Sequence, residues 1–161
     1  MIRPGNGIML GVRYSFRLRG IVALFVAAVT VSAAASHETT VQELKARLSS
    51  ASIGDRPHLC VQIAQKQLTE ADKFYAASEV EKGQAALTDV VAFSELARDY
   101  AIQSHKYQKQ TEIAARTMTR KLTDLMHSLG RDDQAPVRNA INRLERVRDD
   151  LLMAMFPKGA K

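Results

Sequence analysis

The longest regular pattern in the chain is a heptad seam that runs from residue 87 to residue 129. Its positions recur at alternating steps of three and four, and neither Gly nor Pro occurs within residues 84–129. Such a repeat keeps one stripe of a helix facing its packing partner. The seam consists of Leu87, Val90, Ser94, Ala97, Ala101, Ser104, Gln108, Thr111, Ala115, Met118, Leu122, Leu125 and Leu129. It predicts one long central helix over about residues 79–129, which would measure about 75 Å at a rise of about 1.5 Å per residue.

The middle of the seam leaves a second interpretation open. Ser104, Gln108 and Thr111 are polar, whereas the seam is apolar at both ends. A break near residues 103–110 would replace the long helix with a compact bundle of four or five helices. The unbroken helix is the preferred prediction.

Two capping patterns predict where helices begin. Thr40 and Glu43 form a capping box, in which each residue bonds a free backbone N–H of the other, ahead of a helix over residues 41–50. Ser78 and Glu81 repeat the pattern at the start of the seam helix. Gly130 is a natural stop for that helix at its C-terminal end.

Two further amphipathic helices flank the seam. One begins near Pro57, with Asp55 as its cap, and ends near residues 76–77, because apolar residues recur at helical spacing in between. The other is capped by Asp132 or Asp133 and ends at Phe156. Its predicted apolar stripe is Val137, Ile141, Leu144, Val147, Leu151, Leu152 and Met155.

These elements predict an all-α fold in which antiparallel hairpins form around the central helix. The helix that begins near Pro57 should fold back against residues 80–101, and the last helix against residues 108–129. Each half of the central helix needs a further neighbour to cover its stripe. The helix over residues 41–50 is one candidate, and a second copy of the chain is another, so we expect a possible homodimer.

The N-terminal residues have the three zones of a secretory signal peptide. Four arginines precede an apolar run over residues 21–31, and small residues follow, with Ala33 and Ala35 at an A-x-A site. We expect cleavage after Ala35, hence a signal peptide over residues 1–35 and a periplasmic or secreted protein without a stable membrane anchor. The alternative is an uncleaved inner-membrane anchor over residues 21–35. That segment supplies 15 residues, whereas a spanning helix needs roughly 20 apolar residues.

Removal of the leader changes the charge of the protein. The whole chain has a net charge of +6, but the 126 residues after Ala35 hold 19 basic and 17 acidic residues, a net charge of +2. The strong basic excess that would suggest nucleic-acid binding is therefore mostly an export signal, and we expect no nucleic-acid partner. The remainder is long enough for one helical domain over residues 36–157, followed by a disordered tail at residues 158–161.

Motifs for catalysis or cofactor binding are not found in the sequence. It has no C-x-x-C, no H-E-x-x-H, no phosphate-binding glycine loop and no nucleophile elbow. Cys60 lies between apolar neighbours and is expected to be a small buried residue. We therefore expect neither an enzyme nor a cofactor. The alternative is a small metal- or cofactor-binding bundle that would use His58, Cys60 or His127.

The uneven spread of charge is the main indication of function. Residues 36–101 have a net charge of −3, and residues 102–148 have a net charge of +5. One interpretation is a solvated surface with internal ion pairs, each worth at most about 1 kcal/mol. The other is a partner-binding basic face for a protein or an anionic envelope component. Its candidate residues are His105, Lys106, Tyr107, Lys109, Arg138, Arg143 and Arg146.

Two local resemblances add little to this picture. The stretch FYAASEVEKGQAAL resembles the turn of a tetratricopeptide repeat, where an aromatic residue and a small residue at the position of Gly83 let two helices approach. No second copy follows at a 34-residue spacing, so the family is not assigned. The layout also resembles that of small periplasmic chaperones, but LTEAD, LTDVV and LTDLM lack the Gln of their Leu-Thr-x-x-Gln motif. We expect an exported, non-enzymatic binding protein that acts as a scaffold or a chaperone.

Overall fold

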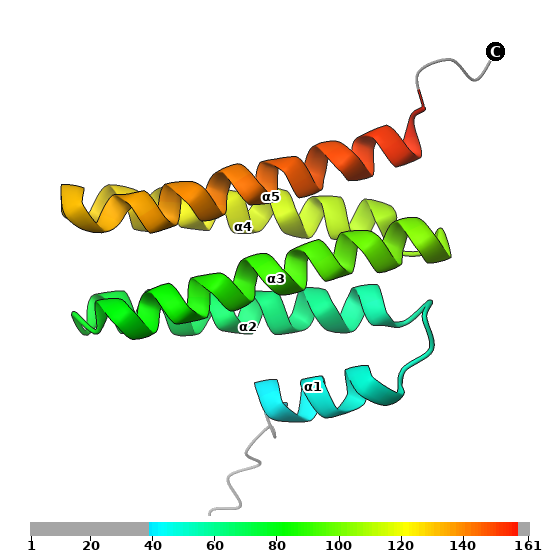
Figure 1. The fold of residues 1–161 in the computed structure, drawn as a ribbon, viewed down its shortest axis with the longest axis horizontal. Helices are drawn as coiled ribbons and strands as arrows, with labels where there is room; N and C mark the ends of the chain where they lie inside the picture. The colour runs from blue at the N-terminus through cyan, green and yellow to red at the C-terminus, as the bar shows by residue number, and fades with distance from the viewer. Residues whose placement is uncertain (1–38, 158–161) are drawn as a thin grey trace, which may run out of the picture. The chain divides into compact units, whose positions relative to one another are not determined.

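The computed structural model describes residues 39–157, which fold into five α-helices and one short 3₁₀-helix (Figure 1). The helices are α1 (Val41–Ser50), α2 (Arg56–Ala76), α3 (Val80–Ser104), α4 (Gln108–Ser128), η1 (Arg131–Asp133) and α5 (Gln134–Met155). This part of the chain contains no strand, so the prediction of an all-α helical bundle is confirmed. The predicted leader, the alternative anchor over residues 21–35 and the predicted tail at residues 158–161 lie outside the described residues.

Two antiparallel hairpins make up the bundle. α2 pairs with α3 and α4 pairs with α5, and these hairpins form the lower and upper halves of Figure 1. α3 packs on α5, while α2 meets α4 less closely. The short helix α1 packs on α2, on the side away from α4 and α5. The predicted fold-back of both flanking helices is thus confirmed.

The prediction of one unbroken helix over residues 79–129 is wrong, because the chain reverses between α3 and α4. His105 and Tyr107 have φ values of 55° and 61°, in the left-handed region that an α-helix does not enter. The break falls inside the polar window of residues 103–110 that the alternative interpretation named. Reversal lets the chain bury both halves of the seam within one bundle, whereas a straight helix would leave each half with one covering partner.

The heptad seam itself is buried on both sides of the break. Its positions from Leu87 to Ala101 and from Thr111 to Leu125 are all buried. Ser104, Gln108 and Leu129, which lie at helix ends, are half-buried. The apolar stripe therefore predicts the buried face of α3 and α4, even though it does not indicate that the chain reverses between these two helices.

The capping box ahead of α1 is confirmed. The backbone N–H of Glu43 donates to Thr40 Oγ1 at 3.2 Å, and the backbone N–H of Thr40 donates to Glu43 Oε2 at 3.0 Å. One turn into the helix, Leu44 is 1 % exposed and packs with Leu59 and Ile63 of α2. The sequence thus fixes both the start of α1 and the side that it buries.

The capping box at Ser78 and Glu81 is not formed. Ser78 instead ends α2, with a φ of 61°. Its backbone N–H donates to Tyr75 O at 3.0 Å, and the N–H of Glu79 donates to Phe74 O at 2.8 Å. This pair of bonds is a Schellman motif, which satisfies the last carbonyls of a helix. Ser78 therefore terminates α2, and its side chain does not cap α3.

The aspartates predicted to cap the other helices occupy the right positions without capping. Asp55 and Asp133 precede α2 and α5, but neither side chain makes a capping hydrogen bond. The Asp55 carboxylate accepts a hydrogen bond from Ser52 Oγ at 2.7 Å instead. The prolines expected in the first turns, Pro57 and Pro136, are there.

The core is larger at one end of the bundle than at the other. We call the end with residues 77–79 and 129–133 the turn end, and the end with residues 51–55, 105–107 and 152–157 the connection end (Figure 1). The cluster nearest the turn end is Ala64, Leu68, Ala71, Tyr75, Ala86, Leu87, Val90, Val91, Met118, Leu122, Leu125, Val137, Ala140, Ile141 and Leu144. The cluster nearest the connection end contains Ala101, Ala115, Val147 and Leu151.

Tyr75 and Gly83 let α2 and α3 approach at the turn end. A Cβ atom added to Gly83 would lie 2.8 Å from Tyr75 Cε2. The close packing of an aromatic ring on a glycine is the local arrangement that the resemblance to a tetratricopeptide turn implied. The Tyr75 hydroxyl is buried without a hydrogen-bond partner. Burial raises the pKa of this hydroxyl, and the Asp133 carboxylate raises it further.

Candidate functional site

The connection between α3 and α4 is held against the start of α2. The rings of His58 and Tyr107 stack with their centroids 5.7 Å apart. The Lys106 side chain lies over Gly54, where an added Cβ atom would be 2.9 Å from Lys106 Cδ. A left-handed conformation costs a non-glycine residue about 1–2 kcal/mol, and these contacts offset that cost. Lys106 and Tyr107 are therefore presented in a defined arrangement.

The seven residues of the predicted basic face fall into two groups. Four lie together at the connection and the first turn of α4, namely His105, Lys106, Tyr107 and Lys109. Three lie on α5, namely Arg138, Arg143 and Arg146. Arg138 belongs to the first turns of α5, at the turn end, so the fold does not bring it to the connection (Figure 1).

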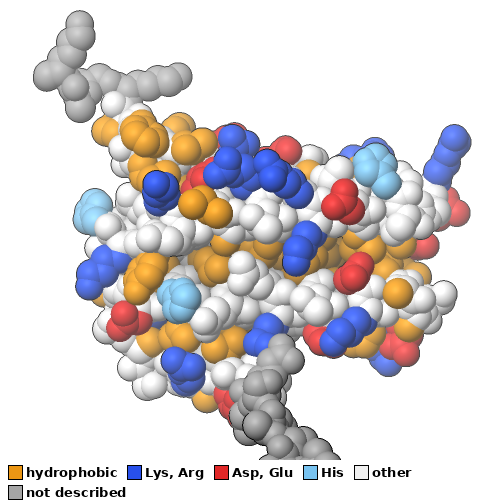
Figure 2. Space-filling model, turned by 180° about the vertical axis from the view of Figure 1, so that it is seen from behind, with side chains coloured by type: hydrophobic (Ala, Val, Ile, Leu, Met, Phe, Trp, Pro, Cys, Tyr) orange, Lys and Arg blue, Asp and Glu red, His pale blue; other side chains and the backbone are white. Residues whose placement is uncertain are grey.

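The outer side of α4 carries four basic residues, of which the sequence analysis placed Lys109 in the basic face, named His127 only for the alternative metal site, and missed Arg116 and Arg120. Lys109, Arg116, Arg120 and His127 are all exposed and follow one another at steps of seven, four and seven, which places them on one side of the helix. We call these four residues the α4 basic face. Figure 2 shows Lys and Arg gathered on the half of the molecule that contains α4. This face could have been predicted from the sequence, because Lys109 and Arg116, and likewise Arg120 and His127, are seven residues apart on the side of the helix opposite the seam.

The one acidic residue in the first half of α4 is buried and pairs with one member of this face, Arg116. Glu112 is 7 % exposed. Its carboxylate accepts from Arg148 Nε and from Arg116 Nη2, both at 3.2 Å. Two guanidinium groups therefore balance Glu112 inside the bundle, and the next acid along α4 is Asp124.

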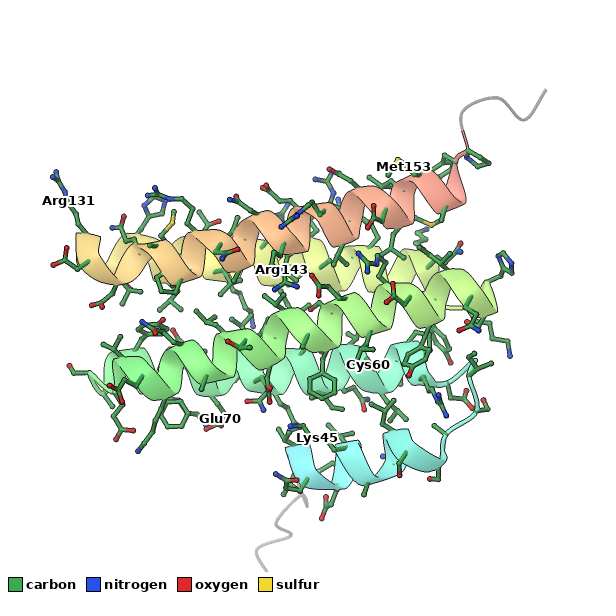
Figure 3. The ribbon with its side chains drawn as sticks, in the orientation of Figure 1. Lys45, Cys60, Glu70, Arg131, Arg143 and Met153 are labelled. Atoms are coloured by element: carbon green, nitrogen blue, oxygen red, sulfur yellow. The ribbon has the colours of Figure 1, made fainter. Side chains whose placement is uncertain are left out.

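Arg143 joins the two hairpins. Its Nε donates to Glu95 Oε1 at 2.9 Å and its Nη2 to Glu95 Oε2 at 2.6 Å, a bidentate pair between α5 and α3. Figure 3 shows Arg143 between the upper and lower hairpins. Arg98 and Asp150 make a second such bridge at 2.8 Å. Bidentate pairing fixes a guanidinium in place, so Arg143 is engaged with its own chain.

Other cations of the connection and of α4 are not paired in this way. The side chains of Lys106, Lys109, Arg120 and Lys121 make no hydrogen bond or ion pair with any residue that the structure describes. The basic charge of the second half of the chain thus includes arginines that are paired between helices, such as Arg143 and Arg148, and exposed cations without an acidic partner among the described residues, on α4 and also at Arg138 and Arg146 of α5.

The residues of the alternative metal site are not brought together. His58 is exposed and Cys60 is 0 % exposed, while His127 lies in the last turn of α4 at the opposite end of the bundle. Residues 39–157 hold no group of three or more His, Cys, Asp or Glu side chains placed to bind a metal ion. Burial raises the pKa of the Cys60 thiol to about 12, an effect that the nearby Arg56 only partly opposes. Cys60 is thus buried, as expected, and its thiol is protonated at neutral pH.

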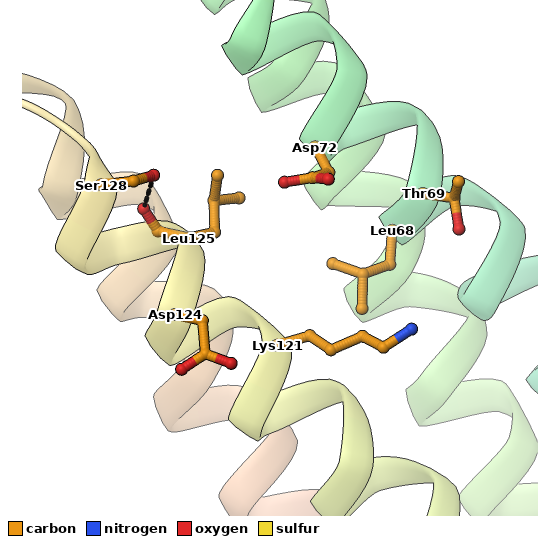
Figure 4. Close-up of a pocket in the computed structure, with 7 residues that line it drawn as sticks. All are labelled: Leu68, Thr69, Asp72, Lys121, Asp124, Leu125 and Ser128. Carbon is orange, nitrogen blue, oxygen red and sulfur yellow. Dashed lines mark hydrogen bonds between the residues drawn. The ribbon is translucent and has the colours of Figure 1, made fainter.

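A groove lies between α2 and α4. It encloses about 460 Å³ and is lined by Leu68, Thr69, Asp72, Lys121, Asp124, Leu125 and Ser128 (Figure 4). In Figure 4 the Lys121 side chain extends from α4 toward α2. Leu68 and Leu125 are only 5 % and 7 % exposed, so the groove offers little apolar surface, and its charges are mixed. It is a weaker candidate than the basic side of α4.

Comparison with known proteins leaves the site as the only basis for a functional argument. No protein-family model matches the chain, and the comparisons with curated proteins and with solved structures found no match. None of the described helices is both long enough and apolar enough to cross a bilayer. The function must therefore be argued from the residues themselves.

Proposed function

We propose that the protein is an exported, non-enzymatic helical binding protein that holds an anionic envelope component against the connection and the α4 basic face. Export is inferred from the signal-peptide pattern of residues 1–35. The observation that supports binding is the separation of the cations into two sets. Lys106, Lys109 and Arg120 have no acidic partner in the described part of the chain. Arg143 and Arg148, by contrast, form ion pairs with Glu95 and Glu112.

The same separation favours binding over catalysis. The ionisable groups that the bundle brings together are ion pairs between helices, such as Glu95 with Arg143 and Glu112 with Arg148. Their geometry serves to hold α5 on α3 and α4. The free cations, by contrast, lie along a solvent-facing surface, where they attract an anion over a distance of about 10 Å at ordinary ionic strength.

Retention on immobilised heparin, used as a general polyanion probe, tests this proposal. The protein would be residues 36–161, because the buried core residues lie between Leu44 and Leu151, and its helicity would be checked by circular dichroism. We expect retention at low salt, and elution at a lower salt concentration for the double variant Lys109→Glu/Arg120→Glu. Polyanion binding weakens steeply with salt in proportion to the number of cations engaged.

The matched control is Arg138→Glu/Arg146→Glu on α5. It changes the net charge by the same amount, at exposed residues without an acidic partner in the described chain. We expect it to elute close to the unmodified protein. Equal losses in the two variants would mean that net charge alone governs retention, and no retention of the unmodified protein would contradict the proposed function.

A further inference from the structure

Large apolar side chains are exposed mainly at the connection end. In the described part of the chain, six large hydrophobic residues are strongly exposed. Five of them belong to segments at or near this end, and their exposed fractions are Ile53 43 %, Tyr107 37 %, Ile113 42 %, Met153 61 % and Phe156 71 %. The sixth, Leu96 at 38 %, lies on α3 about 12 Å before the end of that helix.

Contacts between the three segments show that they form one end of the bundle. Lys106 packs over Gly54, which is next to Ile53. In the last turn of α5, Met155 packs against the cluster that includes Ala101 of α3 and Ala115 of α4. Figure 3 shows Met153 on the outer side of α5, at the opposite end of that helix from Arg131. The exposed apolar residues at this end therefore come from several elements.

The charge around these residues is basic. No acid occurs in residues 51–54, 102–111 or 151–157, whereas His105, Lys106 and Lys109 lie among them. Asp55 accepts a hydrogen bond from Ser52, and Glu112 is buried beneath two arginines. A negatively charged surface that approached this end would meet cations and apolar side chains, and Asp55 is the one exposed acid within residues 51–55, 105–107 and 152–157.

We propose that the connection end docks on an anionic phospholipid membrane. Phe156, Met153, Ile113 and Tyr107 would enter the interfacial layer, and Lys106 and Lys109 would pair with lipid phosphates. This inference rests on the proposed function and names its anionic component. Apolar side chains that enter the headgroup and acyl boundary combine with cations in this way at peripheral membrane surfaces.

A membrane fits this surface better than an acidic protein does. The exposed apolar residues come from separate elements and are set among polar side chains. A protein partner would need a matching pocket for each of them, because interfaces between proteins are packed as densely as protein interiors. A fluid lipid surface adjusts to isolated apolar tips, and tyrosine is enriched at that depth.

Sedimentation with vesicles tests the inference. Residues 36–161 would be mixed with vesicles of phosphatidylcholine alone and with vesicles that also contain phosphatidylglycerol. We expect binding to the anionic vesicles only, and weaker binding at high salt. The variant Met153→Ser/Phe156→Ser should bind the anionic vesicles at least about tenfold more weakly, because each buried apolar side chain contributes to membrane affinity.

The matched control is Leu96→Ser, which removes an exposed apolar residue of α3. We expect it to bind vesicles like the unmodified protein. Retention on heparin should be unchanged in both variants, because neither alters a charge. Folding of all variants is checked by circular dichroism, because Leu96 is 38 % exposed whereas Met153 and Phe156 are more than half exposed.

Three results would overturn the membrane inference. Binding of the unmodified protein to heparin but not to anionic vesicles would keep the proposed function and remove the lipid surface as its partner. Vesicle binding that is unaffected by Met153→Ser/Phe156→Ser would show that the apolar tips do not enter the bilayer. Conversion of a dimer into a monomer by the same variant, measured by light scattering, would show that a second copy covers this end.

Discussion

The two ends of the bundle use the same kind of residue in different ways. At the turn end, Tyr75, Leu125 and Val137 are buried in a large core, and the reversal after α2 is closed by backbone hydrogen bonds at Ser78. Toward the connection end the core consists of two smaller clusters, one with Ala101 and Leu151 and one with Leu44, Leu59 and Ile63, and large apolar residues such as Met153 and Phe156 face solvent. We therefore expect the turn end to contribute more to stability than the connection end, which displays apolar side chains to solvent.

This difference separates a structural role from a functional one. Exposed single apolar residues are ordinary on protein surfaces. Their concentration at one end, together with unpaired cations there, is what calls for an explanation. The predictions below test the comparison from its largest expected effect to its smallest.

Core truncation should cost more at the turn end. Leu122 and Leu151 are both 0 % exposed, but Leu122 belongs to the large cluster and Leu151 to the small one. We expect Leu122→Ala to lower the free energy of unfolding by about 3–5 kcal/mol and Leu151→Ala by about 2–3 kcal/mol, because cost rises with the cavity left behind. Urea denaturation measures both values. A larger cost at Leu151 would reverse the comparison.

Ion pairs should compensate for the smaller core at the connection end. Removing Arg148 leaves the buried Glu112 carboxylate with one partner instead of two. We expect Arg148→Ala to cost about 1–2 kcal/mol, below the value for a fully buried charged hydrogen bond because Arg148 is partly exposed. Arg146→Ala is the control, since Arg146 has no such partner, and it should change stability by less than about 0.5 kcal/mol. Equal effects would argue against a stabilising role for the Glu112 pairs.

The two tyrosines should respond differently to loss of their hydroxyl groups. Tyr75 is buried with an unpartnered hydroxyl, so we expect Tyr75→Phe to stabilise the protein by about 1 kcal/mol at neutral pH. The raised pKa keeps this phenol protonated in the folded state while the unfolded chain ionises. Stability should therefore fall as the pH rises above about 10, and the variant should lose less of it there.

Tyr107→Phe provides the control for that experiment. The Tyr107 side chain is 37 % exposed at the connection end, so its hydroxyl can be hydrated. We expect no change in stability at neutral pH beyond about 0.5 kcal/mol. A loss of stability in Tyr75→Phe would mean that the buried hydroxyl has a partner, such as an ordered water molecule.

The smallest effect should come from relief of the left-handed residue at the turn end. Ser78 has a φ of 61°, a position where glycine carries no steric penalty. We expect Ser78→Gly to stabilise the protein by about 0.5 kcal/mol, because the relief of about 1–2 kcal/mol is partly offset by the greater freedom of glycine in the unfolded chain. Thermal unfolding measures this shift, and a destabilised variant would contradict the strain argument.

The sequence predicts the helices better than it predicts the places where the chain reverses between them. Three features were predicted correctly because each depends on residues close together in the chain. They are the buried seam, the capping box at Thr40 and the apolar stripe of α5. The reversal after α3 depends on contacts of Tyr107 with His58 and of Lys106 with Gly54, about 50 residues away. Neither Gly nor Pro marks it, so local signals favoured a continuous helix.

The candidate site was predictable in part for the same reason. His105, Lys106, Tyr107 and Lys109 are neighbours in the sequence and remain neighbours in the fold. Arg143 could not be assigned correctly, because its partner Glu95 lies 48 positions earlier. The α4 basic face follows a heptad spacing and could have been found by examining the positions opposite the seam.

The absence of tryptophan from the chain allows a direct test of which end meets the membrane. An indole introduced by Phe156→Trp would report from the connection end, and one introduced by Arg131→Trp from the turn end. With vesicles that contain phosphatidylglycerol and brominated acyl chains, we predict a blue shift and quenching at position 156 and no change at position 131. Quenching at position 131 that equals or exceeds that at position 156, or quenching at neither, would contradict the account.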